Sequence, residues 1–272
     1  MAQSAETGLR HAAEARRILA LAGIADAALE RALVTVPRAP FGIEVTEPDA
    51  ADGDAAAAAQ ASPARCMRWV HALGAQPGEH IVHIGAGSGY VTAILAELVG
   101  VTGRVTAIEI DPDRADLARS RLVPWANVTV LCADGADWPQ EPVERVFVSV
   151  AVTHPATPWL SFLGLGGRLV FPFGPPPDGA AAPSANAGAV AVLAVERRQR
   201  GYAAHCVETT ATTRATGRLA ATGGAANPLR RAFGRGGLAH IRSLRLDATP
   251  ETSRLWLFSP EWGLSYDPPP GG

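Results

Sequence analysis

A glycine-rich turn between an apolar run and a helical pattern is the feature that most constrains the fold of this chain. The segment 81–90, IVHIGAGSGY, leads from an apolar strand over 81–84 directly into Gly85, Gly87 and Gly89, and a helical pattern follows over 88–99. Glycine permits positive φ angles and lets a ligand approach the backbone closely. Taken alone, such a turn is as compatible with a purely structural role as with ligand binding.

Short strands and helices continue to alternate after this turn. We expect strands over 104–110, 127–132, 145–150 and 168–173, with helices over 112–122 and 155–163. Strands that alternate with helices form parallel βαβ units with right-handed crossovers. The sequence therefore predicts an α/β fold, a doubly wound Rossmann-like sheet.

The regions on either side of this core divide the chain into three parts. Before the core we expect helices over 5–21 and 26–34, the second without a good N-cap, then a low-complexity loop over 49–59 and a helix over 64–73. After it, 189–198 and 201–210 are expected to pair antiparallel at the sheet edge, and 254–258 forms one more strand. We assign 1–62 to an N-terminal helical cap with a substrate loop, 63–210 to the ligand-binding core and 211–272 to a C-terminal extension.

The spacing of the glycines decides which ligand fits. A dinucleotide fingerprint needs a third small residue where this chain has Tyr90, and a phosphate-binding P-loop needs a lysine, which the chain lacks entirely. The remaining pattern, G-x-G-x-G, suits a ligand that carries an amino acid on a ribose and no phosphate. The residues expected to touch it are Gly85, Ala86, Gly87, Ser88 and Gly89.

Acidic residues end the next two strands. Glu109, followed by Ile110, stands about twenty residues after the glycines, where a carboxylate can accept both ribose hydroxyls. Asp134, followed by Gly135, ends the third strand and is expected near the adenine amino group. Each carboxylate alone could be a solvated strand end or a turn residue. Because open α/β sheets bind ligands at the carboxyl ends of their strands, the three strand ends together predict an S-adenosylmethionine-dependent methyltransferase.

Composition and charge exclude several other classes of protein. An apolar fraction of 47% excludes a disordered chain, and a net charge of -2 argues against nucleic-acid binding. The three cysteines form no CxxC pair, so we expect free thiols and no metal site. No signal-peptide pattern or membrane-length apolar run is present, so a cytoplasmic protein without membrane contact is expected.

Four motifs, taken in order, resemble the protein-L-isoaspartate O-methyltransferase family. They are VPRAPF at 36–41, IGAGSGY at 84–90, ADG at 133–135 and GGRLVFPFG at 166–174, within a resemblance that covers about residues 28–208. The resemblance implies a methyltransferase sheet with a helical N-terminal cap. It also implies methyl transfer from S-adenosylmethionine to a carboxylate of a peptide or protein partner.

The chain departs from the family where the substrate would bind. Relatives carry Thr-Ile-Ser-x-Pro before the core helix, with hydroxyls that face donor and substrate, whereas residues 59–63 here read AQASP. The one hydroxyl, that of Ser62, lies one position away from the family's hydroxyl. Ser62 is the candidate catalytic residue, and Ser62 and Ala61 are both candidates for binding the substrate. The family's Phe-Val-Pro-Leu is replaced by TTRAT at 212–216, and residues 211–272 lie beyond the family's usual end.

A carboxylate acceptor would need no general base, because its pKa of about 4 leaves it ionised at neutral pH. The enzyme would act mainly by orienting the acceptor. Arg214 and Arg218 could pair with an acceptor carboxylate. His154, at the ligand-binding edge, is a substrate candidate too, while His83 is interpreted as a buried strand residue.

Several interpretations of the function stay open at this stage. The substrate could be an isoaspartyl, aspartyl or C-terminal carboxylate, and the altered substrate region favours a specialised peptide-tailoring enzyme. His154 could instead be the base of a small-molecule O- or S-methyltransferase. A non-catalytic, methyltransferase-like partner subunit is the third interpretation. RNA methylation is disfavoured, since neither an Asn-Pro-Pro-Tyr-like motif nor a basic face is evident.

Overall fold

The computed structural model describes residues 2–43, 62–176, 190–220, 226–246, 249 and 254–270. Its helices are α1 (Ala2–Ala22), α2 (Ala27–Thr35), α4 (Pro63–Leu73), α5 (Tyr90–Val99), α6 (Pro112–Arg121), α7 (Thr157–Ser161) and α8 (Ala226–Arg235), with the short helices η1 (Ala39–Phe41), η2 (Gly135–Asp137), η3 (Gly217–Leu219) and η4 (Leu238–His240). Its strands are β1 (His80–Ile84), β2 (Arg104–Glu109), β3 (Val128–Cys132), β4 (Val143–Val148), β5 (Leu163–Phe173), β6 (Val190–Arg197), β7 (Tyr202–Thr210), β8 (Ser243–Arg245), β9 (Leu255–Phe258) and β10 (Gly263–Ser265).

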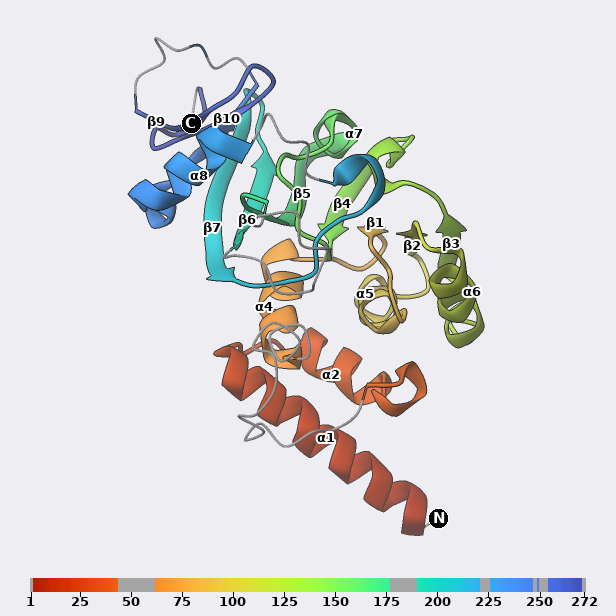
Figure 1. Cartoon of the computed structure of the whole chain (residues 1–272). Coiled ribbons are helices and arrows are strands. Elements are labelled where there is room, and N and C mark those ends of the chain that lie inside the picture. The colour runs from red at the N-terminus through yellow and green to blue at the C-terminus, as the bar shows by residue number, and fades with distance from the viewer. Residues whose placement is uncertain are drawn as a thin grey trace.

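These strands form one sheet in the order β3-β2-β1-β4-β5-β6-β7-β8-β10-β9 (Figure 1). The strands β1 to β5 pair in parallel, as the alternating pattern predicts, and each strand from β6 onwards pairs antiparallel. The chain runs outward from β1 to β2 and β3, then returns to place β4 on the other side of β1. This reversal creates a switch point beside β1, the place where open α/β sheets bind ligands.

Two hydrophobic cores cover the two faces of the sheet, which confirms the doubly wound architecture. Side chains of β6 alternate between them: Val192 and Ala194 belong to the core with α1, α2, α4 and α5, whereas Leu193 and Val195 belong to the core with α7 and α8. Alternation with a period of two is the geometry of a strand buried on both faces. No helix among the described residues is long and apolar enough to span a bilayer.

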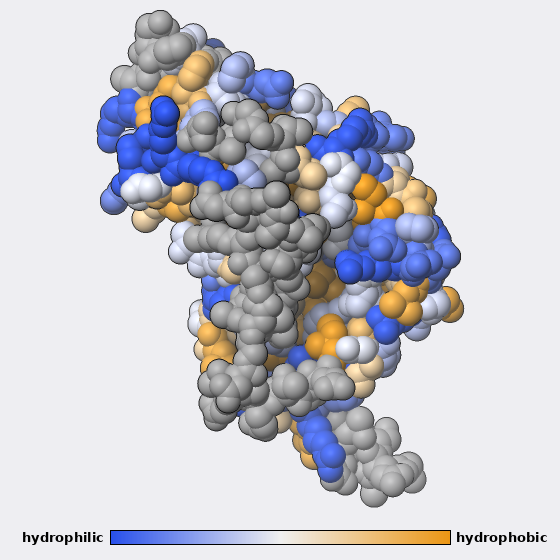
Figure 2. Space-filling view, viewed as in Figure 1, coloured by the Kyte–Doolittle hydropathy of each residue, from blue (hydrophilic) through white to orange (hydrophobic). Residues whose placement is uncertain are grey.

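The C-terminal part of the chain contains more structure than the sequence predicts. The β6–β7 pair is antiparallel as expected, but it lies inside the sheet, because β8, β10 and β9 follow it. The strands β8 and β10 have three residues each, too few to show an alternating pattern. Helix α8 buries Leu229 and exposes Arg231 and Arg235; Figure 2 shows hydrophilic side chains gathered at this end of the molecule.

The N-terminal helices are joined directly to the glycine turn. Arg38, from the VPRAPF motif, is nearly buried and donates to the Glu14 carboxylate of α1 at 3.0 Å. Phe41 packs edge-on against Tyr90, the first residue of α5, with ring centroids 5.6 Å apart. The Arg121 guanidinium of α6 also donates to the Phe41 carbonyl at 2.9 Å. The helical cap is therefore fixed to the same helix that the glycine turn begins.

Helix α2 does have an N-cap, contrary to the expectation from sequence. The Asp26 carboxylate accepts from the backbone N–H groups of Ala28 at 2.9 Å and Leu29 at 3.0 Å. It also lies 3.1 Å from His71 Nδ1 of α4. Aspartate is a preferred N-cap because it satisfies N–H groups that have no partner within the helix.

Replacing Asp26 by alanine is expected to lower the free energy of unfolding by about 1 kcal/mol, because both N–H groups lose their acceptor. Asp26→Asn is the matched control, since it keeps an acceptor oxygen and removes only the charge facing His71. Urea denaturation of the three proteins measures the effect. An Asp26→Ala protein as stable as the parent would show that the cap contributes nothing.

Candidate functional site

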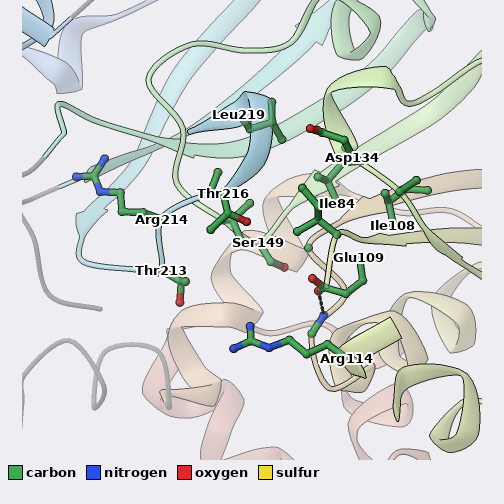
Figure 3. Close-up of a pocket in the computed structure, with 17 residues that line it drawn as sticks. Ile84, Ile108, Glu109, Arg114, Asp134, Ser149, Thr213, Arg214, Thr216 and Leu219 are labelled. Carbon is green, nitrogen blue, oxygen red and sulfur yellow. Dashed lines mark hydrogen bonds between the residues drawn. The ribbon is translucent and has the colours of Figure 1, made fainter. Parts of the chain in front are cut away.

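A pocket lies at the carboxyl ends of the parallel strands, beside the switch point (Figure 3). It has a volume of about 500 Å³. The residues that line it come from the ends of β1, β2, β3 and β4 and from the segment after β7: Ile84, Gly85, Gly87, Ile108, Glu109, Ile110, Arg114, Ala133, Asp134, Gly135, Ser149, Val150, Thr213, Arg214, Ala215, Thr216 and Leu219. The three strand ends singled out by the sequence therefore meet in one pocket.

The glycine turn presents its backbone to this pocket. Its three glycines all have positive φ angles. At Gly87 a side chain would meet no atom within 4 Å, so that this position faces open space rather than packed protein. The Gly87 N–H instead donates to Glu109 Oε2 at 2.8 Å. The turn therefore leaves room for a ligand to lie against its backbone.

Glu109 joins the first two strand ends. The residue is 6% exposed, and its carboxylate accepts from the N–H groups of Gly87 and, at 3.2 Å, of Asp111. An ionised carboxylate has about four acceptor positions, so capacity remains for hydroxyl groups of a ligand. Ile110, the next residue, is 38% exposed and adds an apolar wall. This pair of residues suits a ribose and an attached planar base.

The Asp134 carboxylate is bound by Arg218, from the segment after β7, a contact that the sequence does not predict. Its Oδ1 accepts from the Ala136 N–H at 2.9 Å, and its Oδ2 accepts from the Arg218 backbone N–H at 3.0 Å. The Arg218 guanidinium lies 3.5 Å from Asp134 and also pairs with Asp137. Burial alone would raise the pKa of Asp134, but the two N–H groups and the guanidinium outweigh it and lower that pKa. A ligand amino group at Asp134 must therefore share this carboxylate with Arg218.

We call residues 213–219 the strap, because they cross the pocket from the end of β4 to Asp134. At one end the Ala151 N–H donates to the Thr213 carbonyl at 2.7 Å, and the Ala215 N–H donates to the Ala151 carbonyl at 2.9 Å. At the other end Gly217 has a φ of 64°, in the left-handed region that favours glycine. A Cβ at Gly217 would lie 2.8 Å from Asp134 Oδ2. The strap is thus seated directly on the adenine side of the predicted site.

Arg214 lies near the first end of the strap. Its side chain extends away from Glu109 in Figure 3, and its guanidinium donates to the Gly174 carbonyl at 3.0 Å. Burial, and then the nearby Arg230, lower the pKa of this guanidinium. The positive charge of Arg214 therefore stands at the end of the pocket opposite the glycine turn.

A buried histidine positions a serine that sequence reasoning missed. His83 is 1% exposed, and its ring nitrogens lie 2.8 Å from Thr92 Oγ1 and 2.8 Å from Ser149 Oγ. Burial lowers the pKa of His83 to about 3, so the ring is neutral at physiological pH. Ser149 is the first residue after β4 and lines the pocket. The rule that pointed to Glu109 and Asp134, a polar residue at a strand end, would have found Ser149 as well.

Other candidates from the sequence lie outside the pocket lining. Ser62 is the N-cap residue of α4, although its hydroxyl makes no capping hydrogen bond. His154 Nδ1 lies 3.0 Å from its neighbour Thr153 Oγ1. Neither residue lines the pocket, nor do Ala86, Ser88 and Gly89, whereas Arg114 does without having been predicted. Ala61 lies outside the described residues.

The residues that the structure describes contain no group of three histidine, cysteine or acidic side chains that could hold a metal ion. The polar groups of the pocket are backbone N–H groups, carboxylates, hydroxyls and two guanidinium groups. This set fits a nucleoside with an amino-acid arm.

Comparison with known proteins points to one family. Residues 17–182 match the family model described as protein-L-isoaspartate(D-aspartate) O-methyltransferase. A protein-L-isoaspartate O-methyltransferase of Aeropyrum pernix is 41% identical over 120 residues, which cover 42% of this chain and 46% of that protein. One of Methylorubrum populi is 36% identical over 161 residues, covering 57% and 74%. The chain thus spans about half the length of the first relative and three quarters of the second.

Solved structures show the same fold. A protein-L-isoaspartate O-methyltransferase aligns with 94% of this chain and 88% of its own, at a TM-score of 0.61 and 16% identity. A putative relative from Plasmodium falciparum, solved in complex with S-adenosyl-L-homocysteine, aligns with 76% of this chain and 98% of its own, at a TM-score of 0.57 and 13% identity. The first alignment continues past residue 210, so the similarity of fold extends into the C-terminal part.

The low pKa of His83 predicts that acid destabilises the protein. Below about pH 6.5 an unfolded histidine binds a proton that the buried His83 does not bind, so the free energy of unfolding falls, by at most about 1.4 kcal/mol per pH unit for this one group. His80 and His205, whose pKa values burial also lowers, add to the slope. His83→Gln should therefore reduce the slope rather than abolish it.

Urea denaturation between pH 7.5 and pH 5 measures that slope. His240→Gln is the matched control, because His240 is exposed. A His83→Gln protein with the same pH dependence as the parent and the control would contradict the assignment of a neutral, buried His83.

Proposed function

Because the chain belongs to the protein-L-isoaspartate(D-aspartate) O-methyltransferase family, we propose that it transfers a methyl group from S-adenosylmethionine to a carboxylate of a peptide or protein. The observation that carries this proposal is the meeting of the glycine turn, Glu109 and Asp134 in one pocket of about 500 Å³. That volume lies within the range of small-molecule sites. The three cysteines carry free thiols, which fits a reducing, cytoplasmic setting.

The donor would lie with its ribose at Glu109 and its adenine beside Ile110 and Asp134. Glu109 retains acceptor capacity for the ribose hydroxyls, and the open face of Gly87 leaves space for the amino-acid arm. Asp134 stands at the adenine side, where it would accept an amino hydrogen. The relative from Plasmodium falciparum, which was solved with S-adenosyl-L-homocysteine, supports a nucleoside ligand of this kind.

The acceptor would approach from the side of Ser149 and Arg214. S-adenosylmethionine, when bound, supplies a methyl group on a sulfonium that an ionised carboxylate can attack directly. Of the two guanidinium groups at the pocket, Arg114 stands by the ribose end and Arg214 by the opposite end. Arg214 can therefore hold an acceptor carboxylate by charge-assisted hydrogen bonds, and orientation supplies the main rate enhancement.

The neutral His83 fits this mechanism. A carboxylate acceptor has no proton to remove, so an imidazole with a pKa of about 3 is not needed as a base. It can fix the Ser149 hydroxyl at the edge of the pocket. His154 lies outside the pocket lining, which weighs against its use as a base for a phenol or thiol.

More specifically, we propose that the chain is a specialised peptide-tailoring enzyme. Ser62, with Ala61, is proposed to contact the acceptor from the N-terminus of α4, in place of the two family hydroxyls. In the strap, Arg214 stands where the family has an apolar motif. Its positive charge supports an acceptor peptide that is more negatively charged than that of a general repair enzyme. The methylated group would be an isoaspartyl, aspartyl or C-terminal carboxylate.

Methyl transfer is tested with isotope-labelled S-adenosylmethionine and matched peptides that carry an isoaspartyl residue, an aspartyl residue or a free C-terminal carboxylate. Mass spectrometry before and after mild alkali should detect a base-labile methyl ester on one of them. Glu109→Ala should abolish the transfer by removing the ribose acceptor, whereas Glu261→Ala, at an exposed position, should not. Donor binding without methylation of any peptide would overturn the proposed acceptor. An alkali-stable product on a phenol or thiol would favour the small-molecule alternative.

The strap yields a prediction about donor binding. Arg218→Ala removes the guanidinium that ties the strap to Asp134 and Asp137, so the dissociation constant of S-adenosylmethionine should rise by about two- to fivefold in low salt. Because the Arg218 side chain is exposed, salt at about 0.5 M should remove most of this difference.

Isothermal titration calorimetry at both salt concentrations measures the effect. Arg231→Ala, at an exposed position on α8, is the control for loss of one charge. Tighter donor binding by Arg218→Ala would show instead that Arg218 competes with the adenine for Asp134.

A further inference from the structure

A second groove lies at the opposite edge of the sheet from the methyl-transfer pocket. It is bounded by the amino end of β5, the turn between β6 and β7, and the prolines near the end of the chain, and its volume is about 630 Å³. We call it the arginine groove, lined by Leu165, Gly166, Glu196, Arg197, Arg198, Gln199, Arg200, Ala203, Arg242 and Pro268, Pro269 and Pro270. An adjoining hollow of about 480 Å³ shares Leu165, Arg197 and Arg198 with it and continues toward Pro142.

The groove carries an excess of positive charge in a chain whose net charge is -2. Four arginines line it, and Glu196 is the one carboxylate among its lining residues. That carboxylate is shared by Arg168 at 3.3 Å and Arg198 at 3.2 Å. Arg200 and Arg242 are exposed, and neither has an ion-pair partner in the described part of the chain. Their charges are available to an anionic ligand.

The walls of the groove are apolar and fixed. Pro269 is buried, and a Cβ at Gly201 would lie 3.3 Å from Pro270 Cδ, so the prolines pack closely on the β6–β7 turn. The Arg197 guanidinium donates to the Leu163 carbonyl at 2.9 Å, which holds the opposite wall. On that wall Leu165 is 68% exposed. A ligand here meets a groove that combines apolar sides with several arginines.

This combination fits an extended polypeptide that alternates acidic and apolar side chains. Its carboxylates can pair with the arginines, and its apolar side chains can cover Leu165 and the prolines. A nucleic acid would gain little from those apolar walls, and a chain of net charge -2 offers it few further phosphate contacts.

The size of the reaction pocket gives a reason for a second contact. A pocket of about 500 Å³ is largely filled by a donor of the proposed kind, so a polypeptide acceptor gains little area inside it. Additional affinity for a polypeptide has to come from contacts elsewhere on the surface. A second contact on the same molecule raises the effective concentration of the acceptor residue at the pocket.

We propose that the arginine groove docks an acidic stretch of the same polypeptide whose carboxylate is methylated, which rests on the proposed carboxyl methylation. The arginine groove touches the amino end of β5, whereas the methyl-transfer pocket lies at the carboxyl edge of the sheet, the edge toward which β5 runs. From Leu165 to Phe173 the strand advances roughly 26 Å at about 3.3 Å per residue. The acidic stretch must therefore be separated from the methylated residue by at least about eight residues of extended chain.

The test uses peptides with one methylatable residue, a Gly-Ser spacer of 4 or 20 residues, and a terminal segment of alternating Glu and Leu or of alternating Gln and Leu. With the long spacer, the Glu segment should lower KM by roughly tenfold relative to the Gln segment and leave kcat unchanged. With the short spacer, the two segments should give the same KM, because the chain cannot reach both sites.

The double variant Arg200→Glu/Arg242→Glu should lose the advantage of the Glu segment while it methylates a short peptide normally. Arg31→Glu/Arg231→Glu makes the same change in net charge at exposed positions outside the groove and should keep the advantage. Equal KM values for the Glu and Gln segments at both spacer lengths, or an equal loss in the two double variants, would overturn the proposal.

Fluorescence anisotropy of the labelled Glu–Leu segment alone, without donor, gives a readout that does not depend on methylation. Binding that the Arg200→Glu/Arg242→Glu protein loses supports the groove, even if no peptide is methylated and the proposed function fails. Binding that the variant retains, or complete displacement of the segment by an equimolar single-stranded oligonucleotide, would overturn it.

Discussion

The buried carboxylate of Glu109 is the constraint on which the site depends. A carboxylate withdrawn from water must be satisfied by hydrogen-bond donors. Here the donors are the backbone N–H groups of Gly87, in the glycine turn, and of Asp111, just after β2. The turn can offer the Gly87 N–H only because its backbone takes up the left-handed conformation. One hydrogen bond therefore links the ends of β1 and β2 and sets the shape of the surface that faces the pocket.

The sheet places this hydrogen bond at the edge where the pocket lies. Parallel pairing brings the ends of β1, β2, β3 and β4 to one edge, and the reversal of chain direction beside β1 opens a space between them. Hydrophobic cores on both faces hold the strands in place, and the strands in turn position the side chains at their carboxyl ends, such as Glu109 and Asp134. Trp159 stabilises the third strand end directly, because its indole N–H donates to the Gly135 carbonyl at 3.0 Å.

Much of this arrangement could be predicted from the sequence, for identifiable reasons. Gly87, Glu109 and Asp134 stand at the ends of apolar runs, and parallel strands bring such ends together whatever the details of packing. Contacts between distant segments leave no such pattern: nothing around Arg218 indicates that its N–H reaches Asp134, 84 residues earlier. His83 and Ser149, 66 residues apart, were likewise not connected. The strands β8 and β10 were not predicted because three residues cannot display a period.

We expect the strap to form late in folding. The parallel strands and their helices are complete by the end of β5, whereas the wall across the pocket is supplied by residues that follow β7. A long loop must close before Arg218 can meet Asp134, and the ion pair that then forms has an exposed guanidinium. We expect the strap to dock last and to open first, by a local detachment that leaves the sheet intact. Such an opening would expose the pocket while the rest of the fold stays in place.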